Sequence, residues 1–158
     1  RREWIERLSL RQYGWHMVEA MGDYDRSDWQ PAASARRFEC GSPNMLGIHA
    51  LHASMDLLLQ VGIQSIFDSV SDKVQYLIDN IINCGGVILS SREPKRRAGI
   101  ITFRFDGEDI KARYRHLQEN GVVCALRGGG IRFSPHFYTP EAILQRALAF
   151  SCEPLTDK

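Results

Sequence analysis

An arginine close to a run of glycines is the first feature of this sequence that could bind a ligand. Residues 125 to 141 read ALRGGGIRFSPHFYTPE, where three glycines stand before an alternating strand that carries Arg132. If Ile131 and Phe133 face the core, Arg132 faces the other side of the sheet, beside the glycine turn. Glycines let a backbone approach a ligand closely, and a guanidinium can hold a carboxylate through two hydrogen bonds. The alternative is a surface arginine on an edge strand.

A second candidate site lies at residues 39 to 44, which read ECGSPN. Gly41 and Ser42 precede a predicted helix start, and a glycine and a hydroxyl residue at this position can form an anion cradle. The same residues also suit an ordinary helix N-cap. Local sequence alone leaves both interpretations open.

Two further groups of reactive side chains are weaker candidates. His49, His52 and Asp56 share one helix face, so they could hold a metal, although two histidines at a packing interface fit the spacing better. Cys124 could act as a nucleophile, but it stands among apolar residues of a predicted strand, which favours a buried, inert thiol.

Composition excludes several functional classes. The net charge of +1 over 158 residues predicts no general attraction to nucleic acid or to an anionic membrane. The local run Lys95, Arg96 and Arg97 indicates a solvated loop, with a polyanion site as the alternative. The longest stretch without Asp, Glu, Lys or Arg covers residues 40 to 55, which is too short and too polar to span a bilayer.

The four cysteines and the first residues indicate the cellular compartment and the extent of the chain. The cysteines, at positions 40, 84, 124 and 152, form no CxxC pair and no zinc-ligand spacing. We therefore expect reduced thiols in a cytoplasmic protein without a signal peptide. The chain starts with RREW rather than methionine, and we expect it to be part of a longer protein.

The first half of the chain predicts an arm and two helices. Residues 1 to 38 are weakly patterned, contain all three tryptophans and include a possible short helix near residues 2 to 8. Residues 44 to 61 are apolar almost all round, which is typical of a helix buried in a core or wedged between domains or subunits. Residues 63 to 83 have the three- and four-residue spacing of an amphipathic helix that ends at the following CGG.

The second half changes to a period of two and back again twice. The predicted order is strands at 87–91 and 99–105, a helix at 107–120, strands at 122–127 and 131–138, and a helix at 139–151 with a threonine cap. Two ββα units with short links favour an α+β fold, in which a four-stranded antiparallel sheet carries helices on one face. We assign residues 1–38 to an N-terminal arm, 39–62 to an interface helix and 63–153 to a small α+β domain.

Three motifs in order resemble a known family. RRFECGSPNMLGIHAL, RAGIITFRF and GVVCALRGGGIRFSPHFYTPE are similar to the C-terminal part of class V aminotransferases, over about residues 1 to 150. These are fold-type I, pyridoxal-phosphate-dependent enzymes, and they include cysteine desulfurases, kynureninases and isopenicillin-N epimerase-like proteins. The resemblance implies a homodimer, an N-terminal large domain outside this chain and an amino-acid substrate.

The resemblance also implies roles for individual residues. Arg132 matches the arginine that binds the substrate α-carboxylate, and the glycine turn would let the substrate approach. Gly41 and Ser42 match the motif whose hydroxyl residue reaches the cofactor phosphate of the other subunit. Trp15, with Gly14, is the nearest match to a Gly-Trp pair that lines the cofactor site from the neighbouring subunit.

Two departures from the family pattern narrow the expectation. The usual FYNT is FYTP here, so the asparagine is missing. The Schiff-base lysine of the family lies upstream of Arg1, and none of the four lysines at 73, 95, 111 and 158 stands in its motif. Catalytic residues are therefore expected outside the chain, which alone would be inactive.

The spacing of the last two strands bears on the reaction type. Only RGGG separates them, so a desulfurase that works through a loop cysteine is disfavoured. A transaminase, lyase or epimerase is expected instead. The alternative for the whole chain is a non-catalytic dimerisation or interaction module, which the apolar helix and the tryptophan-rich arm would also suit.

Overall fold

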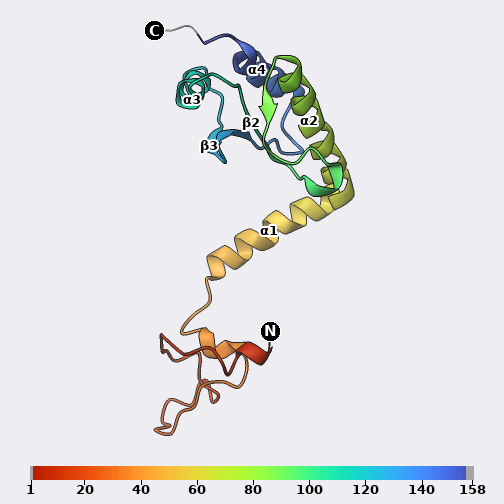
Figure 1. Cartoon of the computed structure of the whole chain (residues 1–158). Coiled ribbons are helices and arrows are strands. Elements are labelled where there is room, and N and C mark those ends of the chain that lie inside the picture. The colour runs from red at the N-terminus through yellow and green to blue at the C-terminus, as the bar shows by residue number, and fades with distance from the viewer. Residues whose placement is uncertain (1, 156–158) are drawn as a thin grey trace. The chain divides into compact units, whose positions relative to one another are not determined.

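The computed structural model describes residues 2–155, which belong to two compact units, Arg1–Leu57 and Leu58–Lys158 (Figure 1). The first unit holds the N-terminal arm and most of helix α1 (Met45–Val61). The second unit holds every strand of the described sheet and three further α-helices.

The second unit is an α+β domain, as the sequence predicts. Its strands are β1 (Val87–Ile88), β2 (Ile101–Arg104), β3 (Ala125–Arg127) and β4 (Gly130–Phe133). They form one antiparallel sheet in the order β1-β2-β4-β3. Its helices are α2 (Ile63–Asn83), α3 (Ile110–Glu119) and α4 (Glu141–Cys152). The strands are shorter than the predicted runs, whereas α2 begins and ends where its periodicity predicts.

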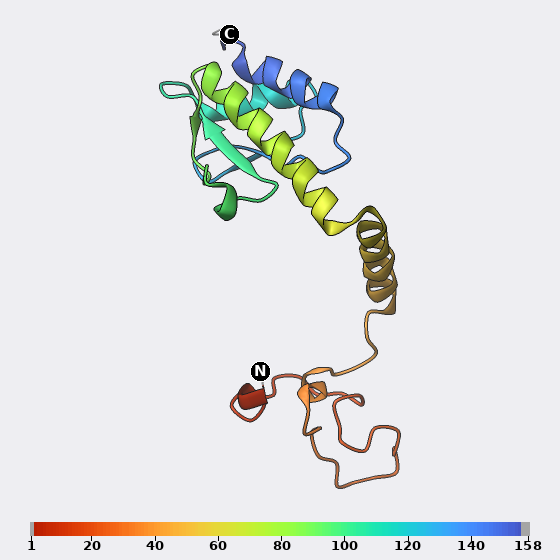
Figure 2. The same cartoon turned by 90° about the vertical axis from the view of Figure 1, so that its right-hand side faces the viewer.

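The core lies between the sheet and the helices. Ile101 and Phe103 of β2 and Ile131 and Phe133 of β4 point toward the helices and are buried. Buried residues of α2, α3 and α4 cover them, and α2 and α4 lie side by side along this layer (Figure 2). The helix residues of this core are Val74, Leu77, Ile78, Ile81, Leu117, Leu144, Ala147 and Leu148. This packing fixes which residues of β4 face away from the helices.

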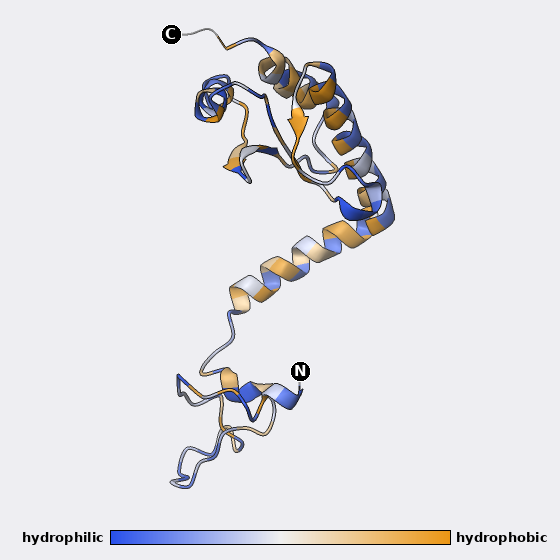
Figure 3. Ribbon diagram, in the orientation of Figure 1, coloured by the Kyte–Doolittle hydropathy of each residue, from blue (hydrophilic) through white to orange (hydrophobic). Residues whose placement is uncertain are grey.

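Helix α1 begins because Asn44 caps it: the backbone N–H of Gly47 donates to Asn44 Oδ1 at 2.9 Å. The sequence predicts a helix that is buried in a core or wedged between domains or subunits; none of its residues is buried here, and hydrophobic residues recur along it (Figure 3). The chain by itself therefore does not bury this helix, and its place at an interface between domains or subunits stays a prediction. Within residues 2–155 no single helix is long and apolar enough to cross a membrane. Helices α1 and α2 taken together have the length and composition of a membrane span, but the chain bends sharply between them.

The arm is more ordered than its composition suggests. A 3-10 helix at Arg2–Trp4 replaces the predicted helix over residues 2 to 8. Val18 and Pro31 form an antiparallel bridge, and the Arg36 guanidinium donates to the carbonyl oxygens of Val18 and Glu19 at 3.0 and 3.1 Å. These contacts join residues that are far apart in sequence, so the local pattern of apolar and polar residues does not predict them.

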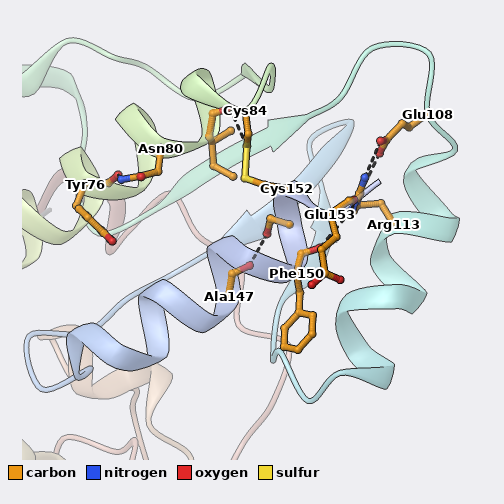
Figure 4. Close-up of a disulfide and its surroundings, with 11 residues drawn as sticks. Tyr76, Asn80, Cys84, Glu108, Arg113, Ala147, Phe150, Cys152 and Glu153 are labelled. Carbon is orange, nitrogen blue, oxygen red and sulfur yellow. Dashed lines mark hydrogen bonds and ion pairs between the residues drawn. A yellow bond between two sulfur atoms is a disulfide. The ribbon is translucent and has the colours of Figure 1, made fainter. Parts of the chain in front are cut away.

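Two local predictions for the second unit are wrong. Thr139 does not cap α4, because its hydroxyl instead accepts a hydrogen bond from the His136 backbone N–H at 2.9 Å, and Pro140 stands at the N-cap. Cys84 and Cys152 are joined by a disulfide across 68 positions of sequence, rather than being reduced thiols (Figure 4). The cytoplasmic location that was inferred from four free thiols stays a prediction.

Candidate functional site

The triple glycine before Arg132 builds a tight hairpin between β3 and β4. Gly128 and Gly129 are the two turn residues and have φ values of 61° and 76°, which glycine adopts at no steric cost. Gly130 faces β2, where a Cβ atom would overlap the carbonyl oxygen of Phe103. Turn geometry and close strand packing therefore explain all three glycines, independently of any ligand.

Arg132 lies on the sheet face opposite the helices, as the alternation predicts. It pairs with Thr102 of β2 on one side and with Ala125 of β3 on the other. Its neighbours along β4, Ile131 and Phe133, are buried in the core. Arg132 is thus in a central strand rather than on the edge, because β3 covers β4, and its side chain is half-buried.

The guanidinium of Arg132 has no partner in the described part of the chain. Among residues 2–155 it makes no hydrogen bond or ion pair, and its buried Nε atom is unsatisfied. Two other arginines of this unit are paired: Arg104 bonds Asp106 at 2.9 Å, and Arg113 bonds Glu108 through two nitrogens. A buried donor without an acceptor costs free energy, so an anion that supplies acceptors would be favoured at Arg132.

In the first unit, two stretches far apart in sequence lie against each other. The backbone N–H of His16 donates to the Cys40 carbonyl oxygen at 3.4 Å, and a Cβ at Gly14 would overlap that same oxygen. The indole Nε1 of Trp15 is 4.0 Å from the position of a Cβ on Gly41. The structure therefore brings together two of the predicted cofactor residues, Trp15 and Gly41, and glycine at position 14 is what permits the contact.

Ser42 is exposed between Gly41 and the first turn of α1. Asn44, not Ser42, supplies the side-chain cap of that helix. The Ser42 hydroxyl makes no hydrogen bond to the described part of the chain. A free hydroxyl beside a helix N-terminus, where backbone N–H groups carry partial positive charge, suits a phosphate oxygen.

Lys73 and Lys111 lie on helices as the sequence predicts, whereas Lys95 lies in a short 3-10 helix rather than in a loop. Lys73 lies in α2 and donates from Nζ to Ser69 Oγ at 2.8 Å, Lys95 lies in a short 3-10 helix, and Lys111 lies in the first turn of α3. Lys158 falls outside the described residues. Each of the three described lysines thus lies on a helix of the second unit.

Two histidines near the candidate residues, His16 and His136, were not predicted from the sequence as site residues. His16 follows Trp15, stacks edge-on against it and lies 3.8 Å from a carboxylate oxygen of Glu39, while its Nδ1 makes no hydrogen bond. His136, four residues after Arg132, stacks on Tyr138 and also has a buried, unpartnered Nδ1. Both histidines stand close in sequence to residues of the family motifs, and this closeness is the sequence feature that could have identified them.

The other candidates of the sequence do not form reactive groups. His49 and His52 are exposed on α1, where His52 contacts Asp56 at 3.3 Å, and no cluster of three metal-ligating side chains occurs within residues 2–155. Cys124 lies just before β3 rather than inside a strand. Burial raises the pKa of its thiol, which disfavours the nucleophilic thiolate.

Comparison with known proteins agrees with these motifs. The family model described as aminotransferase class-V matches residues 1–138, which is most of the chain. The chain belongs to the class-V aminotransferase family. Enzymes of this family depend on pyridoxal phosphate, and the matched range includes Trp15, Gly41, Ser42 and Arg132.

Relatives within the class-V family are much longer than this chain. An uncharacterised aminotransferase, YcbU, of Bacillus subtilis is 28% identical over 152 residues, which is 94% of this chain and 38% of the relative. A probable cysteine desulfurase of Halalkalibacterium halodurans is 27% identical over 86% of this chain and 30% of its own length. The chain therefore spans roughly a third of the curated relatives that it matches.

Solved structures share the fold. A cysteine desulfurase from Thermococcus onnurineus superposes with a TM-score of 0.79 at 18% identity, covering 94% of this chain and 40% of that one. The Escherichia coli cysteine desulfurase CsdA gives a TM-score of 0.75 at 17% identity over 95% of this chain. At such identities the likeness establishes the fold of this class-V chain and not its reaction.

Proposed function

We propose that this chain is the small-domain part of a pyridoxal-phosphate-dependent enzyme that acts on an amino acid. The unpaired guanidinium of Arg132 carries the proposal, because it is a half-buried cation without an acceptor on the open face of the sheet. A carboxylate accepts two parallel hydrogen bonds from a guanidinium, which also orients the molecule that bears it. Arg132 would hold the α-carboxylate of the substrate.

The first unit would serve the cofactor. Ser42 would donate its free hydroxyl to the phosphate of the cofactor, and Trp15 and Gly41 would line its site, in each case across a homodimer as the resemblance implies. Pyridoxal phosphate, when bound, withdraws electrons from the bonds at the α-carbon of an amino acid. The residues of this chain would bind and orient, while the catalytic lysine would come from an N-terminal large domain.

The reaction type is proposed as transamination, β- or γ-elimination, or epimerisation. The β3–β4 hairpin has a two-residue turn of glycines, which leaves no room for a loop cysteine, and burial raises the pKa of the half-buried Cys124 thiol. A desulfurase that relies on such a cysteine is disfavoured on this ground, although desulfurases are among the relatives.

The test of Arg132 uses the longer protein that contains this chain together with the sequence encoded before Arg1. Arg132→Gln removes the charge, and loss of a charged hydrogen bond costs about 1.5–3 kcal/mol, so the amino-acid KM should rise roughly 10- to 100-fold. Arg104→Gln is the control, because Arg104 lies on the same sheet face but is already paired with Asp106. Unchanged KM and turnover in Arg132→Gln would refute the carboxylate role.

The cofactor role of the first unit is tested separately. Ser42→Ala in the longer protein should weaken pyridoxal phosphate affinity, measured by fluorescence titration, without changing the fold. The 158-residue chain alone should form no borohydride-stable adduct with the cofactor on a single lysine. A stoichiometric adduct on one of its own lysines would contradict the proposal.

One observation favours a second candidate, a dimerisation or interaction module without catalysis. Helix α1 exposes large apolar side chains along its whole length, including Leu46, Leu51 and Leu59. Sedimentation equilibrium of the 158-residue chain, with Leu51→Glu as the variant, would distinguish the two. A stable dimer that Leu51→Glu dissociates, combined with no effect of Arg132→Gln on any activity, supports the module.

A further inference from the structure

The disulfide between Cys84 and Cys152 joins the ends of two helices. Cys84 stands directly after the last residue of α2 as its C-cap, and Cys152 is the last residue of α4. Their Cα atoms are 5.7 Å apart, and both residues are half-buried rather than enclosed (Figure 4). Small thiol reagents can therefore reach the bond from solvent.

The two cysteines are held adjacent by contacts that do not depend on the bond. Helices α2 and α4 pack on each other through the common core, with Ile81 one turn before Cys84 and Leu148 one turn before Cys152. The end of α4 is also held by α3, because Arg113 Nη1 donates to the carbonyl oxygens of Phe150 and Glu153 at 3.3 and 2.6 Å. Reduced thiols would thus remain close, at a high effective concentration.

We propose that Cys84 and Cys152 form a reversible thiol–disulfide site that reacts with small disulfide oxidants of the glutathione class. The thiolate of one cysteine attacks oxidised glutathione, displaces one glutathione thiolate and forms a mixed disulfide. The thiolate of the second cysteine attacks the protein sulfur of that mixed disulfide and displaces the second glutathione. The two protons lost by the cysteines go to the two glutathione thiolates, and two electrons reduce the oxidant. A dithiol reduces the bond in two exchanges: one of its thiolates forms a mixed disulfide with one cysteine and releases the other, and its second thiolate then displaces that cysteine, so that the dithiol leaves as its own disulfide and its two protons pass to the cysteines.

The other two cysteines are free thiols and take no part in this disulfide. Cys124 is free, and burial raises the pKa of its thiol, so its thiolate fraction is small. Cys40 is free and belongs to the first unit, so it shares no helix with the pair. Within the second unit, only the 84–152 pair therefore has two half-buried sulfurs in bonding geometry.

The bond would act on the stability of the sheet rather than on chemistry at Arg132. All four strands, and therefore Arg132, lie in the chain segment that the disulfide closes. Closing a long loop removes conformational freedom from the unfolded chain and thereby favours the folded unit. Oxidation would make the unit that carries Arg132 more resistant to unfolding, and reduction would loosen it, whether or not the enzyme function proposed above holds.

The experiment uses the 158-residue chain, equilibrated in glutathione buffers of graded potential, quenched with N-ethylmaleimide and analysed by mass spectrometry. The expected result is a population that lacks two hydrogens, in which peptide mapping links Cys84 to Cys152, and that returns to four alkylated cysteines with excess dithiol. The thermal midpoint should fall by about 10–20 °C on reduction. Cys40→Ser and Cys124→Ser should leave the link between Cys84 and Cys152 and the change in the thermal midpoint unaltered.

Three outcomes would overturn the proposal. The first is four alkylated cysteines at every potential, and the second is a link that involves Cys40 or Cys124. The third is a bond that forms without changing the thermal midpoint. Cys84→Ser and Cys152→Ser, each measured under reducing conditions against the reduced chain, should match its midpoint, which separates loss of the bond from damage to the fold. An unchanged Arg132→Gln activity, by contrast, would refute only the proposed function.

Discussion

Arg113 is the residue whose replacement should destabilise the second unit most through a polar contact. It is 3% exposed, and its guanidinium bonds the Glu108 carboxylate through Nε at 2.9 Å and Nη2 at 2.6 Å. Its third nitrogen donates to two carbonyl oxygens at the end of α4. The same guanidinium lies 5.1 Å from the Phe105 ring centroid. One side chain therefore ties α3 to α4.

The magnitude follows from burial. Deleting one partner of a buried ion pair costs about 3–5 kcal/mol, because the other charge is left without compensation. The side chain of Glu108 is 27% exposed and regains part of its hydration, so about 3 kcal/mol is expected for Arg113→Met. For a domain of this size that corresponds to a fall of roughly 12–24 °C in the thermal midpoint.

Arg104→Met is the matched control, followed like the first variant by circular dichroism melting of the 158-residue chain. Arg104 makes an Nε bond to Asp106 at the same 2.9 Å, but the two side chains are 44% and 66% exposed. Such surface pairs contribute about 0–1 kcal/mol. If Arg104→Met lowered the midpoint as much as Arg113→Met, or if Arg113→Met changed it by only a few degrees, the reasoning from burial would be refuted.

Three further predictions concern single positions. Gly130→Ala should destabilise the second unit by more than about 2 kcal/mol, because the new Cβ overlaps the carbonyl oxygen of Phe103, whereas Gly107→Ala, with open space and φ 86°, should cost about 1 kcal/mol in urea unfolding. Alkylation of Cys124 should stay slow when the pH equals the ordinary pKa of a thiol, and it should accelerate only at higher pH. Because the pKa of this thiol is higher in the folded chain than in the unfolded chain, the free energy of unfolding should fall as the pH rises through the interval between the two pKa values. Asn44→Ala should lower the helicity of α1 by removing its cap, worth about 1 kcal/mol, and an unaltered circular dichroism spectrum would contradict this.

The sequence by itself determined the elements that have a strong local period. The three- and four-residue spacing located α2 from Ile63 to Asn83, and the alternation around Arg132 placed it opposite the buried Ile131 and Phe133. These inferences succeed because the side-chain direction in a helix or strand repeats along the chain. The ββα order likewise limited the sheet to an antiparallel arrangement.

Only the tertiary structure decided the contacts between residues that are distant in sequence. Cys84 and Cys152 meet because α2 and α4 pack side by side, and the spacing of the cysteines in the sequence does not predict this disulfide. The contact of Trp15 with Gly41 likewise depends on the fold of a weakly patterned arm. Local periodicity determines which residues share a face of a helix or strand. Tertiary packing determines what each face contacts, and only the packed structure shows that the buried Nε atom of Arg132 has no hydrogen-bond partner in the described residues.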